Sequence, residues 1–435
     1  MKEISQSLEG PMKRSLIVAA SLLFILCFAE VAFTDQLSPA ERKIAAAENA
    51  IRKNPNKAEP YSDLAMALAR RARETSDAAY YARAEEALKK ALELSPQNLA
   101  VQKVGVWILL GKHEFAQARQ QAEILNRRMP DDVQVYGFLT DANIELGNYA
   151  DAEKAAQWML DIRPGNLAGL TRGAYLRELM GDLEGSLELM TQAYQETPPA
   201  ETEDRAWILT QMAHVQLSSG RVDAADKLLK AALVLYPDYH YALENLAQVR
   251  TAQKKYVEAV DLLRRRNQSV PQPESLYALA EALERDGQAQ DAKAAFLEFE
   301  AKARTQMGIA DNANRELVFY YADHAHNPEE ALRIATMEFS RRHDAFTLDA
   351  FAWALYVSGQ FAEAQKQMDH ALAYGTRNPK FFFHAGAIAS KLNQGPKAAL
   401  LLNQAVALDV LADYTPLARK ILAALAPMNT ASVTQ

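Results

Sequence analysis

The sequence predicts an all-α protein built as a stack of helix pairs, and two periodic markers lead to this prediction. A small residue, alanine in all but one case, recurs at intervals of 33, 34 or 39 residues. The ten positions are Ala84, Ala118, Ala152, Ser186, Ala225, Ala259, Ala292, Ala331, Ala364 and Ala398. Prolines close the first units in step with them, at Pro96, Pro130, Pro164, Pro198, Pro237 and Pro271. Such a period is typical of units too small to bury their own apolar faces, which therefore stack on their neighbours.

The composition agrees with a helical chain and argues against a nucleic-acid partner. Only 17 glycines and 17 prolines occur in 435 residues, and the prolines gather at unit ends, where they stop helices. The formal net charge is -7, whereas binding of phosphate groups requires a clustered basic surface. The one basic run, residues 264–266, falls late in an expected helix, where the helix dipole favours cations. We therefore expect no nucleic-acid partner.

Residues 131–164 show the unit most clearly. A first helix is indicated by the helical spacing from Tyr136 to Asn143. Gly147 then supplies a turn, because glycine tolerates the left-handed backbone that ends a helix. A second helix carries Ala152 on its inner face and stops at Pro164. The result is a helix–turn–helix of about 34 residues.

This pattern closely resembles the tetratricopeptide repeat, and the resemblance covers about residues 57–409, some ten units. The turn recurs closely at Gly181, Gly220 and Gly359, and more loosely at Gly111, Lys254 and Gly287. The resemblance implies a right-handed superhelical solenoid, with first helices lining a concave groove and second helices forming the convex back. The small residue lets the two helices touch, since a bulky side chain there would overpack the contact by about 1–3 kcal/mol.

The array is expected to be flanked by caps and divided once. Terminal units otherwise expose an apolar face, so a capping helix is predicted at each end, over residues 39–53 and 416–425. Residues 199–204 exceed the regular unit length and are predicted to form an acidic loop that marks a hinge between two sub-arrays. The unit over residues 315–341 lacks the turn glycine and is expected to turn at residues 326–328. The predicted divisions are an export signal or anchor over 1–34, an N-terminal cap over 35–56, sub-arrays over 57–198 and 199–410, and a cap with a disordered tail from Met428 over 411–435.

The N-terminus has the order of a secretory signal. Lys13 and Arg14 precede an apolar run over residues 16–28, and small residues follow. Cleavage after Ala29 and cleavage after Thr34 both fit this pattern. The sequence therefore predicts a periplasmic or secreted protein of a bacterial cell envelope.

Two alternatives for this segment stay open. Residues 15–33 are close to the ~20 residues that cross a bilayer, so they are also compatible with an uncleaved membrane anchor. The single cysteine, Cys27, lies within the segment and is a candidate lipidation site, although no small residue precedes it. The acidic stretch before Met12 is atypical of a signal, which favours Met12 as the true start.

The first helices carry a second stripe of aromatic and acidic residues besides the one that packs inside the units. The predicted groove residues are Trp207, Tyr241, Glu244, Tyr277, Glu281, Tyr320, Phe346, Asp349 and Trp353. Rings are rigid anchors for a peptide, and carboxylates favour a basic or amide-rich partner. The rings are compatible either with an open groove or with packing between units, whereas the carboxylates are expected to be exposed.

The sequence indicates no enzyme, cofactor or metal. The only local cluster is Asp323-His324-Ala325-His326, and residues two positions apart on a helix point in different directions. The sequence contains no Gly-rich phosphate loop after a strand, no Gly-x-Ser-x-Gly and no His-Glu-x-x-His. A metal-dependent enzyme that uses this cluster is thus the weakest of three hypotheses.

The preferred hypothesis is an exported scaffold that binds a protein or peptide partner in its groove during envelope assembly or secretion. The alternative is a membrane-tethered accessory subunit that binds by its convex face. The Lys/Asn/Arg clamp by which this family holds a C-terminal carboxylate is not matched, because Thr, Glu and Tyr stand at those positions. A chaperone-tail function is therefore not implied.

Overall fold

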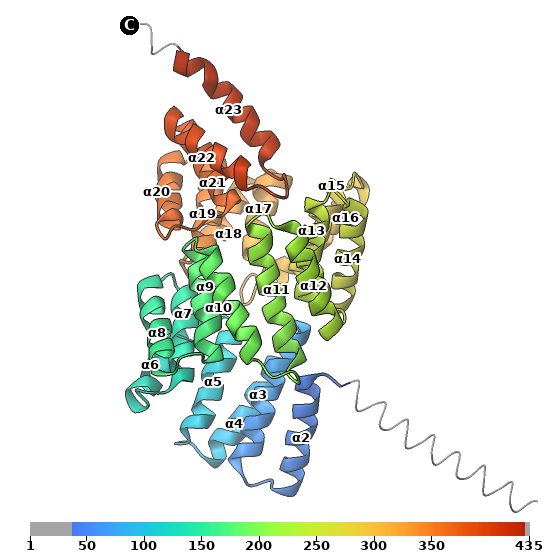
Figure 1. Ribbon diagram of the computed structural model, residues 1–435, viewed down its shortest axis with the longest axis vertical. Helices are drawn as coiled ribbons and strands as arrows, with labels where there is room; N and C mark the ends of the chain where they lie inside the picture. The colour runs from blue at the N-terminus through green and yellow to red at the C-terminus, as the bar shows by residue number, and fades with distance from the viewer. Residues whose placement is uncertain (1–36, 431–435) are drawn as a thin grey trace, which may run out of the picture.

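The computed structural model describes residues 37–430, and every regular element in that part of the chain is a helix (Figure 1). The predicted signal, the start at Met12, Cys27 and the anchor all lie outside the described residues. Within them, no helix combines the length and the apolar character that crossing a membrane demands.

The helices pair into ten units between two terminal helices. The terminal helices are α2 (Pro39–Lys53) and α23 (Thr415–Thr430). Units 1 to 5 are α3 (Ala58–Thr75) with α4 (Ala79–Leu94), α5 (Leu99–Gly111) with α6 (Phe115–Arg128), α7 (Val133–Glu145) with α8 (Tyr149–Ile162), α9 (Leu167–Leu179) with α10 (Leu183–Glu196), and α11 (Thr202–Ser218) with α12 (Val222–Leu235). Units 6 to 10 are α13 (His240–Ala252) with α14 (Tyr256–Ser269), α15 (Pro273–Arg285) with α16 (Ala289–Gln306), α17 (Asn314–Phe319) and the π-helix η1 (Tyr320–His324) with α18 (Pro328–Phe339), α19 (Ala345–Val357) with α20 (Phe361–Leu372), and α21 (Pro379–Lys391) with α22 (Gly395–Leu408).

The periodic small residues lie where the sequence places them. All ten are in the second helices of their units, and none is more than 1% exposed. Each of the six marker prolines follows the second helix of its unit by two residues. The all-α superhelical solenoid is thus confirmed.

The turns inside the units use left-handed backbone, as predicted. Gly147 and Gly359 have φ of 77° and 78°, and Lys254 adopts φ 60° where glycine is missing. In unit 8 the left-handed residue is His326, with φ 50°, and the side chain of Asn327 caps α18. The predicted turn at residues 326–328 is therefore present.

The two terminal helices lie at opposite ends of the molecule (Figure 1). Helix α2 has the predicted bounds, and Ser38 and Glu41 close its N-terminus with a capping box. Helix α23 is longer than predicted and continues to Thr430, so the disordered tail predicted from Met428 does not begin there. The carboxylate of Asp409 accepts hydrogen bonds from the backbone N–H of Tyr414 and Thr415 at the start of α23.

The superhelix closes on itself after six units. In units 1 to 4, the turn after the first helix meets the loop that precedes the first helix six units later. Four hydrogen bonds join residues 196 or 197 positions apart: Gln272 to Ser76, Arg342 to Glu145, Ala345 to Tyr149, and Thr376 to Leu179. His113 and Asp311 approach to 3.2 Å in the same register. We call this line of contacts the seam, and it brings α9 against the units that begin with α19 and α21 (Figure 1).

The surplus residues 199–204 belong to this closure and do not form an exposed acidic loop. Helix α11 already begins at Thr202, and Glu203 is fully buried. Its carboxylate pairs with Arg73 of α3, 130 positions earlier. The acidic run is therefore part of a contact between unit 1 and unit 5, and the division into two sub-arrays stays a prediction.

Candidate functional site

The nine predicted groove residues divide into two sets by exposure. Tyr277, Tyr320, Asp349 and Trp353 are buried, with 2–8% of their surface exposed. The other five are half-buried: Trp207, Tyr241, Glu244, Glu281 and Phe346. The inner wall of the superhelix is thus largely a packed surface.

Trp353 shows how the inner rings are used. Its indole N–H donates to Asp323 of η1 at 2.8 Å. Its ring stacks on Tyr356 of its own helix and on His384 of α21, with centroids 4.6 and 4.1 Å away. Trp353 therefore joins units 8, 9 and 10. Asp323, which belongs to the cluster of residues 323–326 noted in the sequence, is its hydrogen-bond acceptor.

The expectation that the carboxylates are exposed is wrong for Asp349. This residue is 2% exposed, and its Oδ1 lies 2.7 Å from Nδ1 of His384 in the next unit. A buried carboxylate is tolerated where a hydrogen-bonding partner replaces water. The sequence could not reveal this partner, because it comes from the neighbouring first helix.

The other predicted residues also have partners within the described chain. Tyr277 packs against Phe296 and Phe299, with ring centroids 5.8 and 5.1 Å away. Glu244 pairs with Arg266 at 3.0 Å, and Glu281 approaches Arg285 at 3.9 Å. In the remaining contacts, the O–H of Tyr320 donates to Glu300, the ring of Tyr241 packs at a tilt against His240, and Trp207 lies between two apolar clusters.

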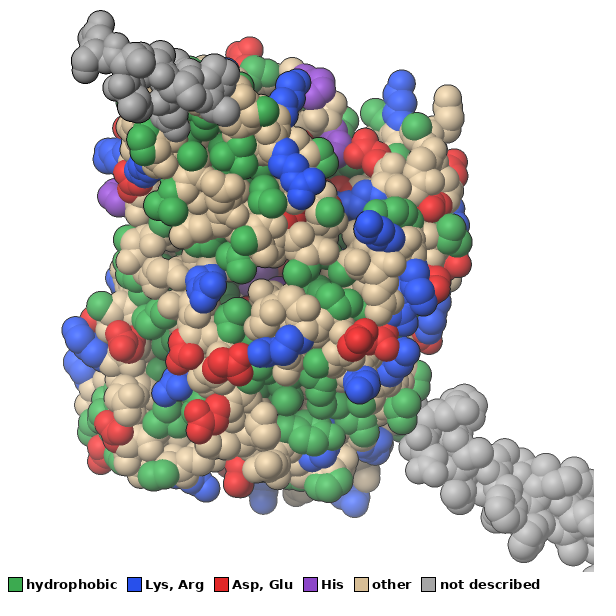
Figure 2. Space-filling model, turned by 45° about the horizontal axis from the view of Figure 1, so that its top comes forward, with side chains coloured by type: hydrophobic (Ala, Val, Ile, Leu, Met, Phe, Trp, Pro, Cys, Tyr) green, Lys and Arg blue, Asp and Glu red, His purple; other side chains and the backbone are tan. Residues whose placement is uncertain are grey.

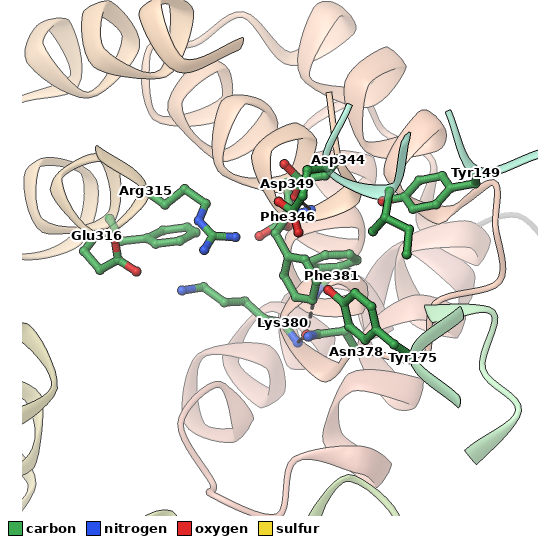
Figure 3. A pocket seen from close by; sticks show the side chains of 13 residues that line it. Tyr149, Tyr175, Arg315, Glu316, Asp344, Phe346, Asp349, Asn378, Lys380 and Phe381 are labelled. Carbon is green, nitrogen blue, oxygen red and sulfur yellow. Dashed lines mark hydrogen bonds between the residues drawn. The ribbon is translucent and has the colours of Figure 1, made fainter. Parts of the chain in front are cut away.

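Phe346 and Asp349 do line a cavity, and it lies on the seam. Its volume is about 430 Å³, and its walls come from units 3 and 4 on one side and units 8 to 10 on the other (Figure 3). The lining residues are Ile144, Glu145, Tyr149, Tyr175, Arg315, Glu316, Phe319, Asp344, Phe346, Asp349, Asn378, Lys380 and Phe381. Of the predicted groove residues, this cavity brings together these two.

Two cations extend into the cavity from helix starts. Arg315 is the second residue of α17 and Lys380 the second of α21, and both side chains reach the same open space in Figure 3. The ammonium of Lys380 sits 3.3 Å from the ring centre of Phe319, and the guanidinium of Arg315 is 5.8 Å from that of Phe346. Within residues 37–430, neither side chain forms an ion pair or a hydrogen bond.

Most of the acidic residues that line the cavity are engaged. Asp344 caps α19 through the backbone N–H of Phe346 and Thr347. Glu145 lies 3.4 Å from Arg342 across the seam. Burial and the negative charge of Asp344 raise the pKa of Glu145 to about 7. Glu316 is the lining acid whose carboxylate has no partner among the described residues.

No pattern in the sequence indicates Arg315, Lys380 or Glu145 as site residues. They stand in units 8, 10 and 3, and they meet only because the superhelix closes after six units. Each one alone is an ordinary charged residue near a helix end. To recognise them as site residues from the sequence, one would have to know the pitch of the superhelix.

The described chain offers no obvious metal centre. Residues 37–430 hold no group of three His, Cys, Asp or Glu side chains placed to bind a metal ion. In the cluster of residues 323–326, His324 lies 3.3 Å from Glu284, whereas Asp323 contacts Trp353, so these two side chains have separate partners. On the face in Figure 2, basic and acidic side chains are mixed, without a continuous basic patch.

Comparison with known proteins supports the repeat assignment. Residues 210–270, which cover the second half of α11 and all of α12, α13 and α14, match the family model described as tetratricopeptide repeat. This part of the chain is thus similar to tetratricopeptide repeats. No curated protein matches the chain.

Several solved structures are similar to this chain at low sequence identity. The anaphase-promoting-complex hetero-tetramer Cut9–Hcn1 is 13% identical over 78% of this chain and 57% of that chain, with a TM-score of 0.45. Naa15/Naa10 bound to HypK-THB is 18% identical over 87% and 62%, with a TM-score of 0.29. A tetratricopeptide repeat protein from Parabacteroides merdae is 18% identical over 60% and 98%, with a TM-score of 0.35. This chain thus spans less than two thirds of the first two.

Proposed function

We propose that this protein is an exported scaffold that holds a segment of a protein partner during assembly or secretion at a bacterial cell envelope. The observation that supports this proposal is the uninterrupted stack of ten units, part of which is similar to tetratricopeptide repeats. Such a stack presents one long surface that no single compact unit could offer. The export step rests on the charged, apolar and small residues of the N-terminal sequence.

The half-buried rings of the inner wall are the proposed anchors for the partner. Trp207 and Tyr241 keep part of their surface accessible, whereas Trp353 and Tyr277 are buried by packing against neighbouring helices. A ring that is already partly fixed by its neighbours loses little conformational entropy when it binds a partner. We therefore place the contact near the first helices of units 5 and 6.

The experiment is capture of partners from cells that produce the full chain, with two matched tryptophan variants. Trp207→Ala removes a half-buried ring from the inner wall, and Trp158→Ala removes a half-buried ring from the second helix α8. We expect the identified partner to be lost with Trp207→Ala and retained with Trp158→Ala. The reverse result would favour binding by the convex face, and an unchanged partner in both would reject both surfaces.

Localisation is tested separately by fractionation of the same cells. We expect the protein in the soluble periplasmic or secreted fraction, with a mass that corresponds to cleavage near Ala29 or Thr34. Recovery with the membrane at the full mass would instead support the anchor over residues 15–33. Recovery in the cytoplasm would contradict export.

A further inference from the structure

We propose that the seam cavity is a binding site for an organic anion, namely a carboxylate attached to an apolar or aromatic body. The cavity lies between α7, α8 and α9 on one side and α17, α19 and α21 on the other. This inference does not depend on the scaffold function, because it concerns a small-ligand site and is tested with purified protein.

The first argument is that two cations reach the cavity without a direct ion pair of their own. Other arginines of similar burial have a carboxylate partner within ion-pair distance, for example Arg266 with Glu244 and Arg342 with Glu338. Arg315 and Lys380 have none within residues 37–430, although both are half-buried. Partly buried cations are costly unless an anion is near, and a guanidinium binds a carboxylate with two parallel hydrogen bonds.

The second argument is the balance of charge around the cavity. Asp344 is engaged by the start of α19 and approaches Arg342 at 3.6 Å. Asp349 is engaged by His384, and Glu145 is partly protonated near neutral pH because burial raises its pKa to about 7. Glu316 is then the one lining acid without a direct contact, against two such cations. A ligand with a single negative charge would give both cations a partner.

The third argument is the apolar part of the wall. Phe346 and Phe319 flank the two cations, and Phe381, Tyr175 and Ile144 line the rest of the space. A volume of about 430 Å³ lies within the usual ~300–1,000 Å³ of small-ligand sites. Five rings and Ile144 share the wall with seven charged or amide side chains, an arrangement that suits an anion with an apolar body.

The ligand would contact both turns of the superhelix. Tyr175 and Glu145 belong to units 3 and 4, whereas Arg315 and Lys380 belong to units 8 and 10. Occupancy would therefore strengthen the seam, since a ligand that binds only the closed arrangement stabilises it.

The test uses the protein purified after expression of the full chain, with calorimetry and thermal unfolding as readouts. The probes are phenylacetate, its neutral analogue phenylacetamide, and the blocked dipeptide acetyl-Phe-Glu-amide. We expect at least one of the two acids to bind and to raise the unfolding temperature. Phenylacetamide should bind at least tenfold more weakly than phenylacetate, since a charge-assisted hydrogen bond contributes at least about a factor of ten. Tighter binding of phenylacetate indicates a free organic acid as the ligand, and tighter binding of the dipeptide indicates an acidic side chain of a protein.

Two matched double variants locate the site. Arg315→Gln with Lys380→Gln removes the cavity cations, and Arg419→Gln with Lys420→Gln removes the same charge from exposed positions on α23. We expect binding to weaken at least tenfold in the first variant and to stay unchanged in the second. Equal binding of acid and amide by the unaltered chain, no binding of either acid, or equal loss in both variants would overturn the proposal.

Discussion

The superhelix is held closed by different chemistry in two places. Between units 1 and 5, at a contact that we call the charged seam, Arg70 and Arg73 of α3 pair with Glu201, Glu203 and Asp204 at the start of α11. Between units six apart, at the part of the seam that we call the backbone seam, side-chain hydroxyls bond to main-chain groups. There the hydroxyl oxygen of Tyr149 accepts from the backbone N–H of Ala345 at 2.8 Å, and the hydroxyl of Thr376 donates to the carbonyl of Leu179 at 2.7 Å.

The difference shows that one superhelical pitch can be fixed either by charge or by shape. Long arginine side chains reach across a gap, so the charged seam tolerates small shifts but requires its ions to remain paired. Glycine turns remove the gap at the backbone seam, which leaves no room there for an added methyl group. The two contacts should therefore fail under different changes.

The largest effect is expected from Glu203→Ala in the charged seam. Glu203 is fully buried, pairs with Arg73 and accepts a hydrogen bond from the O–H of Tyr239 at 2.6 Å. Its removal leaves the buried hydroxyl of Tyr239 without a partner and leaves Arg73 with Asp204 alone, for a loss of about 3 kcal/mol in the free energy of unfolding. Denaturant unfolding measures it, with Glu258→Ala as the control, because Glu258 also pairs with an arginine but is half-exposed. Equal losses in the two variants would contradict the role of burial.

A smaller effect is expected from Gly147→Ala in the backbone seam. Gly147 and Gly359 have nearly the same φ, 77° and 78°, so alanine strains both turns alike. A Cβ on Gly147 would lie 2.5 Å from the carbonyl oxygen of His343, whereas nothing lies within 4 Å at Gly359. Gly147→Ala should therefore cost about 1–3 kcal/mol more than Gly359→Ala in thermal or denaturant unfolding. Equal costs would show that the seam does not close at this turn.

The same pair of glycines shows how far the sequence could go. Both occupy the turn that the repeat pattern predicts, and both adopt the expected left-handed backbone. The helix bounds, the buried small residues and the glycine-free turn at His326 were predictable for the same reason, since each depends on residues within one unit. Only one of the two glycines touches another turn of the superhelix, and nothing in the local sequence distinguishes them.

The pitch of the superhelix is what the sequence could not supply. The pitch results from the small rotations between successive units added together, and no local sequence pattern encodes that total. Without the pitch, the acidic run at the start of α11 resembles a loop, although Glu203 is buried. For the same reason the sequence predicts an exposed side chain for Asp349, which is also buried. The cavity was missed because Glu145 and Arg315 come from units 3 and 8.

The backbone seam also contains one titratable contact, at Glu145. Because burial raises the pKa of Glu145 from 4.5 to about 7, the folded chain holds a proton there that the unfolded chain has lost. Stability from this group is complete below about pH 4.5 and is lost as the pH rises through 7. Glu145→Gln should therefore match the unaltered chain near pH 4.5 and exceed it at pH 8 by about 1 kcal/mol, a size that allows for partial exposure. Unfolding free energies across this pH range measure the difference, and an unchanged slope would contradict it.

The smallest effect is expected from Lys43→Ala at the solvent edge of the charged seam. Lys43 lies 3.2 Å from Glu201, but its side chain is 50% exposed, and Glu201 also pairs with Arg70 at 2.7 Å. Water and salt screen an exposed pair, and Glu201 keeps a partner after the change, so the loss should be at most about 1 kcal/mol and should fade at high ionic strength. Unfolding at low and high salt separates this pair from Glu203, whose buried contact should respond less to salt. A large, salt-independent loss of stability for Lys43→Ala would mean that the charged seam depends on its exposed ion pairs. The contrast with the backbone seam would then rest on surface ions and not on the burial of Glu203.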